Sequence, residues 1–287
     1  MSRASDAARQ FLWETGYDDL VGQDLTQLVL SLGLYYEEAP LKGCEGMIVY
    51  SPSGRSGKIT VNSETRYEPR KRFSIAHEIG HYLLDHNKLH CDNPGTLDCY
   101  RQENQETEAN EFASELLMPT PAFMKAIAGR PFSPKLMEDI SEHFGTSISS
   151  VVYRYVSCGA HPVAVVYSYK GKVVWMKKNR DMRRWMIDWT GLNVPKNSVT
   201  EEFFQYGVVY DTDDIQDIDI GVWFQDSRKQ FQGGGQDSWR VKHALGGHRG
   251  WDSYEDTDDA DDGGGSCHEC CFVSEKFGGV LAVIWED

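Results

Sequence analysis

Two histidines and a glutamate in the first third of the chain have the spacing of a zinc-peptidase helix. His77, Glu78 and His81 form the pattern His-Glu-x-x-His. On a helix of about 3.6 residues per turn, His77 and His81 project from one face a single turn apart, so both imidazoles can bind one metal ion. Glu78 lies beside that face, where it can accept a proton from a water that the metal holds. The pattern predicts a catalytic zinc ion bound by the two histidines.

The histidines stand in a strongly apolar stretch. Apolar side chains spread around most of the expected helix, as in a helix buried within a domain: Phe73, Ile75, Ala76, Ile79, Leu83 and Leu84. Imidazoles in such a place need polar partners. A metal ion is one such partner, and hydrogen bonds within an ordinary core are the alternative.

Composition and charge limit the classes of partner. The chain has 287 residues, 40% of them hydrophobic, which is enough to form the core of one large or two modest domains. Lysine and arginine number 29 against 44 aspartate and glutamate, a net charge of -15. Such a field repels phosphate backbones and anionic membrane surfaces and favours a basic protein partner. We therefore expect a protein partner rather than a nucleic acid or a membrane.

The sequence also bears on the compartment. Its first residues lack the continuous apolar core of a signal peptide, and no apolar run is long enough to span a bilayer, so we expect a cytoplasmic protein. The seven cysteines are an odd number with irregular spacing. Reduced thiols are therefore expected rather than a disulfide framework.

The third zinc ligand must come from elsewhere, because a two-histidine site needs at least one more protein ligand. The extended motif that recruits a third histidine places it six residues after the second, where this chain has Asn87. His86, one residue earlier, does not match that motif. A carboxylate from a second buried helix is the better candidate.

Residues 103–118 are expected to form that second helix, since apolar residues and glutamates share it and Pro119 ends it. Glu108 lies at the margin of the buried stripe of this helix. The same periodicity puts Glu106 on the opposite face and Glu111 toward solvent. We predict Glu108 as the third ligand.

Two stretches of the sequence resemble the ImmA/IrrE metallopeptidases. Residues 72–84, with the His-Glu-x-x-His pattern, and residues 106–119, which begin Glu-Thr-Glu-Ala-Asn-Glu-Phe-Ala, are similar to the family's paired motifs in order and separation. Residues 57–62 also resemble the segment before the family's zinc helix. The resemblance covers about residues 5–156 and is far more specific than the histidine pattern alone.

The resemblance implies a zincin-like fold with zinc held by two histidines and a glutamate. By motif match these ligands are His77, His81 and Glu108, and Glu78 is the general base. Members of the family typically cleave a helix-turn-helix transcriptional repressor, which switches on genes for radiation response or mobile-element transfer. A repressor of that class is therefore the implied protein substrate.

The fold class expected for the whole chain is α+β, in three parts. Residues 1–130 form a zincin-like metallopeptidase domain, residues 131–158 a helix-turn-helix-like segment, and residues 159–287 a β-rich domain with acidic, glycine-rich loops. The helical segment has Lys135 and Arg154 as nearly its only basic residues, so direct DNA binding is not expected. IrrE-type members carry a GAF-like sensor domain after the peptidase, and no motif decides whether residues 159–287 are one.

Local signals predict several elements directly. Short apolar runs bounded by turn residues favour strands at 46–50 and 58–62, and a third strand at 279–285. A β-hairpin is expected to turn at Lys170 and Gly171. Gly33 is expected to end a short helix, because glycine adopts the left-handed conformation at little cost.

A Cys-x-x-Cys pair near the C-terminus is half of a common structural zinc site. Cys267 and Cys270, followed by Cys271, have no evident second half apart from the cysteines and histidine of residues 90–99. A second zinc, redox sensing and ordinary reduced cysteines are the open alternatives. The acidic stretch 252–265 suggests calcium binding, but its spacing does not match the calcium loop, so a solvated loop is expected.

Two rival functions use the same residues. A regulatory binding protein with this metal site would sequester a transcription factor without cleaving it. A structural metal site would have no open coordination position. The oxyanion stabiliser of a peptidase is not identified by the pattern, and Tyr82, Tyr153 and Arg154 are its candidates.

Overall fold

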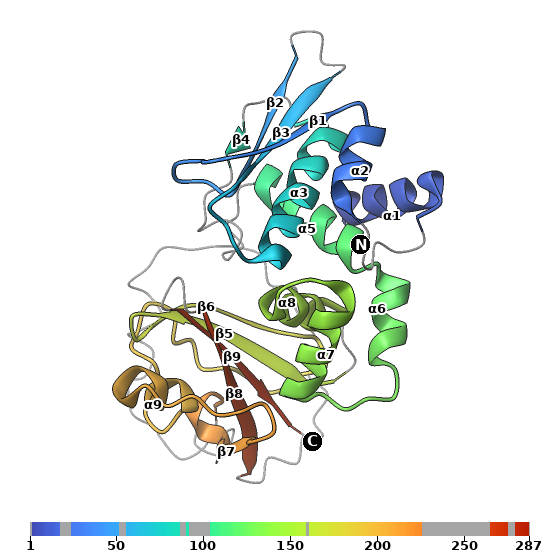
Figure 1. The fold of residues 1–287 in the computed structure, drawn as a ribbon. Helices are drawn as coiled ribbons and strands as arrows, with labels where there is room; N and C mark the ends of the chain where they lie inside the picture. The colour runs from blue at the N-terminus through green and yellow to red at the C-terminus, as the bar shows by residue number, and fades with distance from the viewer. Residues whose placement is uncertain are drawn as a thin grey trace.

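The computed structural model shows an α+β protein, as the sequence predicts (Figure 1). It describes residues 2–17, 24–51, 56–86, 90–91, 104–158, 161–225, 265–274 and 279–286. Within these residues, a four-stranded sheet with its helices forms the upper part of the view and a five-stranded sheet forms the lower part. The helices of residues 120–158 lie between the two. The stretch considered for calcium, 252–265, lies outside the described residues except for its last glycine.

The first sheet has short strands of mixed direction. They are β1 (Tyr35–Ala39), β2 (Gly46–Tyr50), β3 (Gly57–Asn62) and β4 (His90–Cys91), in the order β1-β3-β2-β4. β1 runs parallel to β3, whereas β2 runs antiparallel to both β3 and β4. The strands expected at 46–50 and 58–62 are confirmed. β1 and β4 are the edges of this sheet in the described part of the chain.

Helices pack beside this sheet and carry the predicted motif. They are α1 (Arg3–Thr15), α2 (Leu25–Ser31), α3 (Glu68–Leu83) and α5 (Asn104–Leu117). α3 packs on β2 and β3 and against α5, which also packs on α1. Gly33 takes a positive φ of 74° just after α2, as expected of a helix end. The shared core includes Phe11, Leu28, Ile48, Ile59, Ile79 and Phe112.

Three helices connect the two sheets. They are α6 (Thr120–Ile127), α7 (Pro134–Phe144) and α8 (Ile148–Cys158). Ser133 begins α7 by accepting a hydrogen bond from the Leu136 amide, and Gly145, with a φ of 60°, ends it. α7 and α8 are the helix pair expected from the sequence. Their apolar faces share a core with one face of the second sheet, including Phe144, Val152, Tyr155, Val163, Val283 and Trp285.

The second sheet is antiparallel throughout. Its strands are β5 (Val163–Tyr169), β6 (Lys172–Lys178), β7 (Gln216–Asp219), β8 (Ser266–Ser274) and β9 (Gly279–Trp285), in the order β6-β5-β9-β8-β7. The hairpin at Lys170 and Gly171 is confirmed, with positive φ at both residues. The last strand is confirmed as well. The opposite face packs under α9 (Val199–Tyr206) and the 3-10 turn η1 (Ile220–Val222).

A buried carboxylate holds α9 on the second sheet. Glu269 of β8 is 0% exposed and accepts hydrogen bonds from the Val199 and Thr200 amides at 3.1 and 3.0 Å. It also accepts from the Thr200 hydroxyl at 2.6 Å and from the Trp223 indole at 2.9 Å. Burial raises the pKa of this carboxyl, and these donors oppose that rise.

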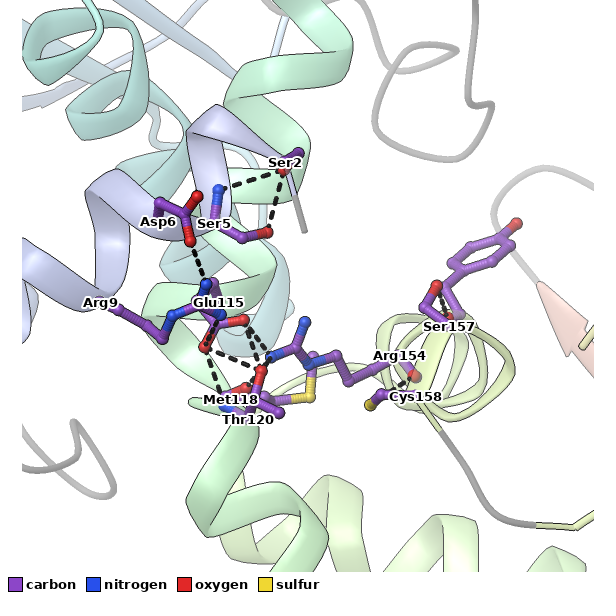
Figure 2. Close-up of polar contacts among 11 residues, drawn as sticks. Ser2, Ser5, Asp6, Arg9, Glu115, Met118, Thr120, Arg154, Ser157 and Cys158 are labelled. Atoms are coloured by element: carbon purple, nitrogen blue, oxygen red, sulfur yellow. Dashed lines mark hydrogen bonds and ion pairs between the residues drawn. The ribbon is translucent and has the colours of Figure 1, made fainter. Parts of the chain in front are cut away.

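A buried ion pair joins α8 to the first part of the molecule (Figure 2). Arg154 is 8% exposed, and its Nη2 donates to Glu115 of α5 at 2.5 Å. The same nitrogen donates to the Met118 carbonyl and to the Thr120 hydroxyl, each at 2.9 Å. Glu115 also accepts from the Thr120 amide at 2.9 Å and lies 3.5 Å from Arg9 of α1. One carboxylate thus ties together four helices.

The cysteines of β8 lie on opposite faces of the strand, which bears on the alternatives that the sequence left open. Side chains alternate between the faces of a strand, so Cys267 and Cys271 pack on the α9 side, whereas Cys270 packs on the side of α7 and α8. Burial, reinforced by the charge of Glu269, raises the pKa of all three thiols. Cys267 and Cys270 therefore cannot bind one metal ion or form one disulfide in this fold, and these thiols are free.

A different cysteine corrects the expectation of reduced thiols. Cys44 is disulfide-bonded and 4% exposed. The side chain of its partner lies outside the described residues. The odd count and irregular spacing missed this bond because a disulfide joins residues that only the fold brings together. Among the described residues, no helix has both the length and the apolar content to cross a membrane.

Candidate metal centre

Helix α3 presents its two histidines to α5. His77 and His81 are both 0% exposed, and their ring centroids lie 4.6 Å apart. Their Nε2 atoms approach to 2.9 Å. The helix and the shared face predicted from the histidine spacing are therefore confirmed.

The close contact of the two helices depends on a glycine. A Cβ atom at Gly80 would lie 3.2 Å from the Phe112 Cβ and 3.3 Å from the Ala109 Cα. These separations are tighter than ordinary van der Waals contact, so glycine lets the backbones of α3 and α5 approach. The approach brings the first turns of α5 within reach of the histidines.

Glu106 of α5 completes the cluster. Its Oε2 lies 3.2 Å from His77 Nε2, and its Oε1 lies 3.5 Å from His81 Nε2. One ligand atom from each of these residues lies within 4.8 Å of the others. Atoms bound tetrahedrally at zinc–nitrogen distances of about 2.05 Å are separated by about 3.3 Å. Two imidazoles and a carboxylate at these separations fit a zinc ion in both donor type and geometry.

The predicted third ligand, Glu108, does not belong to this cluster. Its Oε2 instead lies 3.1 Å from His86 Nε2. The prediction that Glu106 lies on the opposite face is wrong, because Glu106 lies three residues before Ala109 and seven before Ala113, both 0% exposed. Residues at these spacings share one helix face, so Glu106 faces α3 rather than the opposite side.

Partners behind the histidines orient the rings. The Nδ1 of His77 lies 3.0 Å from the Asn110 Oδ1, and the Nδ1 of His81 lies 2.9 Å from the Nδ1 of His86. An amide oxygen only accepts, so His77 donates from Nδ1 and its Nε2 lone pair faces the cluster. The sequence reading missed Asn110, although it lies four residues after Glu106 and so shares its face.

The charge on Glu106 suits a metal ligand. Burial raises the pKa of this carboxyl, and interactions with His77 and His81 lower it by more, to well below the usual range. The carboxylate is therefore ionised at neutral pH.

Glu78, the predicted general base, is 0% exposed on α3. Burial raises the pKa of the nearby Tyr50 phenol, and the negative charge of Glu78 raises it further. Tyr50 stacks on Tyr82 with ring centroids 6.2 Å apart. Glu78 thus lies on the side of α3 that faces β2, in a place that shields its carboxylate from bulk water.

The three candidate oxyanion stabilisers lie in different places. Tyr82 follows the second histidine and stacks on Tyr50. Tyr153 packs against Trp175 of the second sheet, at 5.2 Å between ring centroids. Arg154 is bound to Glu115. Of these three residues, only Tyr82 lies on α3, the helix that carries His77 and His81.

Within the described residues, His77, His81 and Glu106 are the one group of histidine, cysteine and acidic side chains that converge like metal ligands. The family model for the IrrE N-terminal-like domain of the M78 peptidases matches residues 42–155. The radiation response metalloprotease IrrE of Deinococcus radiodurans is 32% identical over 112 residues, which are 38% of this chain and 33% of that protein. The chain thus matches about a third of the length of that relative.

The fold as a whole is similar to that of a solved structure. A Mycobacterium tuberculosis transcriptional regulator superposes on 100% of this chain and on 77% of its own, with a TM-score of 0.52. The two sequences are 12% identical. At that identity the likeness concerns the fold alone.

Proposed function

We propose, from the match of residues 42–155 to the IrrE N-terminal-like domain and the similarity to IrrE, that the chain is a zinc-dependent endopeptidase of the ImmA/IrrE family. The observation that carries the proposal is the convergence of His77 Nε2, His81 Nε2 and the Glu106 carboxylate. Imidazole and carboxylate ligands in a tetrahedral arrangement suit zinc. We propose Glu106, in place of Glu108, as the third ligand.

The chemistry divides between the metal and the protein. Zinc bound here would polarise the scissile carbonyl and acidify a coordinated water. Glu78 accepts a proton from the attacking water at its carboxylate and passes it to the leaving amine. Asn110 keeps His77 in the orientation that presents Nε2.

The proposed substrate is a helix-turn-helix transcriptional repressor, whose cleavage would start a stress or mobile-element response. The family supports this choice, and so does charge. A DNA-binding repressor has a basic surface, and the net charge of -15 on this chain speeds its encounter with such a partner. An extended segment of the substrate can pair with an edge strand of the first sheet, as in strand addition.

The experiment uses the purified, zinc-loaded full chain and a candidate repressor encoded nearby. Wild-type protein is expected to cleave the repressor, detected as defined fragments by mass spectrometry. Glu78→Gln should bind one zinc ion and lose cleavage by roughly 10²–10⁴-fold. Glu111→Gln, a partly exposed glutamate of α5, is the matched control. Unchanged cleavage by Glu78→Gln would contradict the mechanism.

Two rivals give different results in the same assay. A binding protein that sequesters the repressor would form a stable complex with wild type and with Glu78→Gln but cut in neither. A structural metal site would show four protein ligands and no exchangeable water. The cytoplasmic location, the three-part domain division and a GAF-like identity for the second sheet stay predictions.

A further inference from the structure

The buried His86 and the partly exposed Glu108 form a hydrogen-bonded pair beside the proposed metal ligands, and the hydrolysis described above does not use it. His86 is 3% exposed and follows the end of α3. Asp85 has a positive φ of 59°, which turns the chain back, and the His86 amide donates to the His81 carbonyl at 3.0 Å. This turn places the His86 ring beside the His81 ring, with centroids 5.0 Å apart. The backbone itself thus brings the two imidazoles together.

For neutral imidazoles, the hydrogen bonds of this arrangement run in one direction. A carboxylate accepts and does not donate, so His86 Nε2 donates to Glu108 Oε2 at 3.1 Å. A neutral imidazole has one donor and one acceptor, which makes His86 Nδ1 the acceptor of the proton on His81 Nδ1, at 2.9 Å. The lone pair of His81 then lies on Nε2, the atom that faces Glu106. The carboxylate therefore determines the tautomers of two rings in series.

We propose that Glu108 and His86 are positioning residues that fix the tautomer of His81 and raise its affinity for zinc. This inference rests on the zinc site proposed above. An acceptor behind a ligand histidine orients its ring and increases its basicity. In this chain the carboxylate acts through an intervening imidazole.

The two ligand histidines are held differently. His77 donates to Asn110, a neutral amide on the same helix as Glu106. His81 donates to a histidine that is itself polarised by a carboxylate. The negative charge of Glu108 therefore favours electron donation by His81 more than Asn110 favours donation by His77. Zinc affinity should depend on the charge at position 108.

Zinc affinity of the full chain tests this assignment. Glu108→Ala removes the acceptor and is expected to raise the Kd for zinc roughly 10–100-fold, measured by competition with a chromophoric chelator. Glu108→Gln keeps an acceptor but loses the charge, so its Kd should lie between those of Glu108→Ala and wild type. Glu111→Ala is the matched control on the same helix and should bind as wild type does.

The tautomers give a readout that a merely structural role would not change. Long-range ¹H–¹⁵N spectra of the histidine rings in the zinc-loaded wild type should show His86 protonated at Nε2 only. Glu108→Ala should convert His86 to a mixture of tautomers. His86→Gln, whose amide oxygen can accept from His81, should bind zinc more tightly than His86→Ala.

Several results would overturn the assignment. One is a zinc Kd of Glu108→Ala within about twofold of wild type, and another is a His86 ring protonated at Nδ1 in the zinc-loaded wild type. A loss far beyond 100-fold with an altered Co²⁺ absorption spectrum would make Glu108 a ligand instead. If Glu108→Ala does not fold, the tautomer of His86 in the zinc-loaded wild type tests the assignment by itself. A wild type that binds no zinc would refute the proposed function, whereas failure of the positioning role would leave zinc binding and cleavage intact.

Discussion

The two ends of α5 each bury a glutamate, and the two side chains have opposite uses. Glu115, near the C-terminal end, is 1% exposed and meets the guanidinium of Arg154. Glu106, about 13 Å closer to the N-terminal end at about 1.5 Å per residue, has a 17% exposed side chain and meets two imidazoles. A guanidinium carries a permanent charge, so Glu115 is neutralised within the protein. Imidazoles supply lone pairs, so the Glu106 end offers the donors that the proposed zinc ion requires.

The difference indicates that the partner, and not the residue type, separates the structural carboxylate of Glu115 from the proposed metal ligand Glu106. Both glutamates come from the same apolar, glutamate-rich helix. The Glu115 end holds α1, α5, α6 and α8 together (Figure 2). At the Glu106 end, the other two members of the cluster, His77 and His81, both come from α3 within the described residues. Four changes test this contrast.

The largest effect is expected from Glu106→Ala. Loss of one of three protein ligands should raise the Kd for zinc by more than about 100-fold. This increase is larger than the one expected when a residue that only orients a ligand is removed. Stability of the metal-free protein should change little, because no fixed positive charge is left unpaired. Chelator competition and thermal unfolding without zinc measure the two quantities. Glu111→Ala serves as the control, and wild-type zinc affinity in Glu106→Ala would refute the ligand assignment.

Arg154→Met should have the opposite profile. It leaves Glu115 buried without its main counter-charge, which typically costs about 3–5 kcal/mol. Urea unfolding of the metal-free protein measures this loss. The double variant Arg154→Met with Glu115→Gln should recover a large part of it, since no unpaired charge then remains. A zinc Kd that rises in the folded single variant would mean that the two ends of α5 are not independent.

Gly80→Ala tests the helix contact on which the Glu106 end depends. The new methyl would lie 3.2 Å from the Phe112 Cβ. Overpacking costs about 1–3 kcal/mol, and the better helix propensity of alanine offsets about 1 kcal/mol of it. A net loss of about 1 kcal/mol in the free energy of unfolding is expected, with weaker zinc binding. Unchanged stability and affinity would show that α3 and α5 tolerate separation.

The smallest effect concerns pH. Burial raises the pKa of the Glu115 carboxyl, but the charge of Arg154 and hydrogen bonds from Thr120 and Arg154 lower it by more, to below its ordinary value of 4.5. A depressed folded-state pKa stabilises the protein above the unfolded-state pKa, and this contribution is lost as pH falls through the folded-state value. Wild type should therefore lose more stability between pH 6 and pH 3 than Glu115→Gln does. Urea unfolding at each pH measures this loss. An equal loss of stability in wild type and Glu115→Gln would show that the Glu115 carboxyl is not its source.

The sequence by itself determined the features that depend on neighbouring residues. His77 and His81 share a face because of helix geometry alone, and Lys170 and Gly171 turn the chain by local conformational preference. The paired motifs also predicted that a glutamate of α5 would approach the histidines. The first two signals each lie within a few residues, so no knowledge of packing was needed, whereas the paired motifs indicated this approach through their resemblance to a family.

Only the tertiary structure showed which of Glu106 and Glu108 meets the histidines, although the spacing to Ala109 and Ala113 puts Glu106 on the buried face of α5. Both lie in the first turns of α5, and the packing of this helix on α3 brings Glu106 to His77 and His81 and Glu108 to His86. The disulfide of Cys44 likewise depends on the fold, and so does the pairing of Arg154 with Glu115. Each joins residues far apart in the chain, and periodicity along one element carries no information about such contacts.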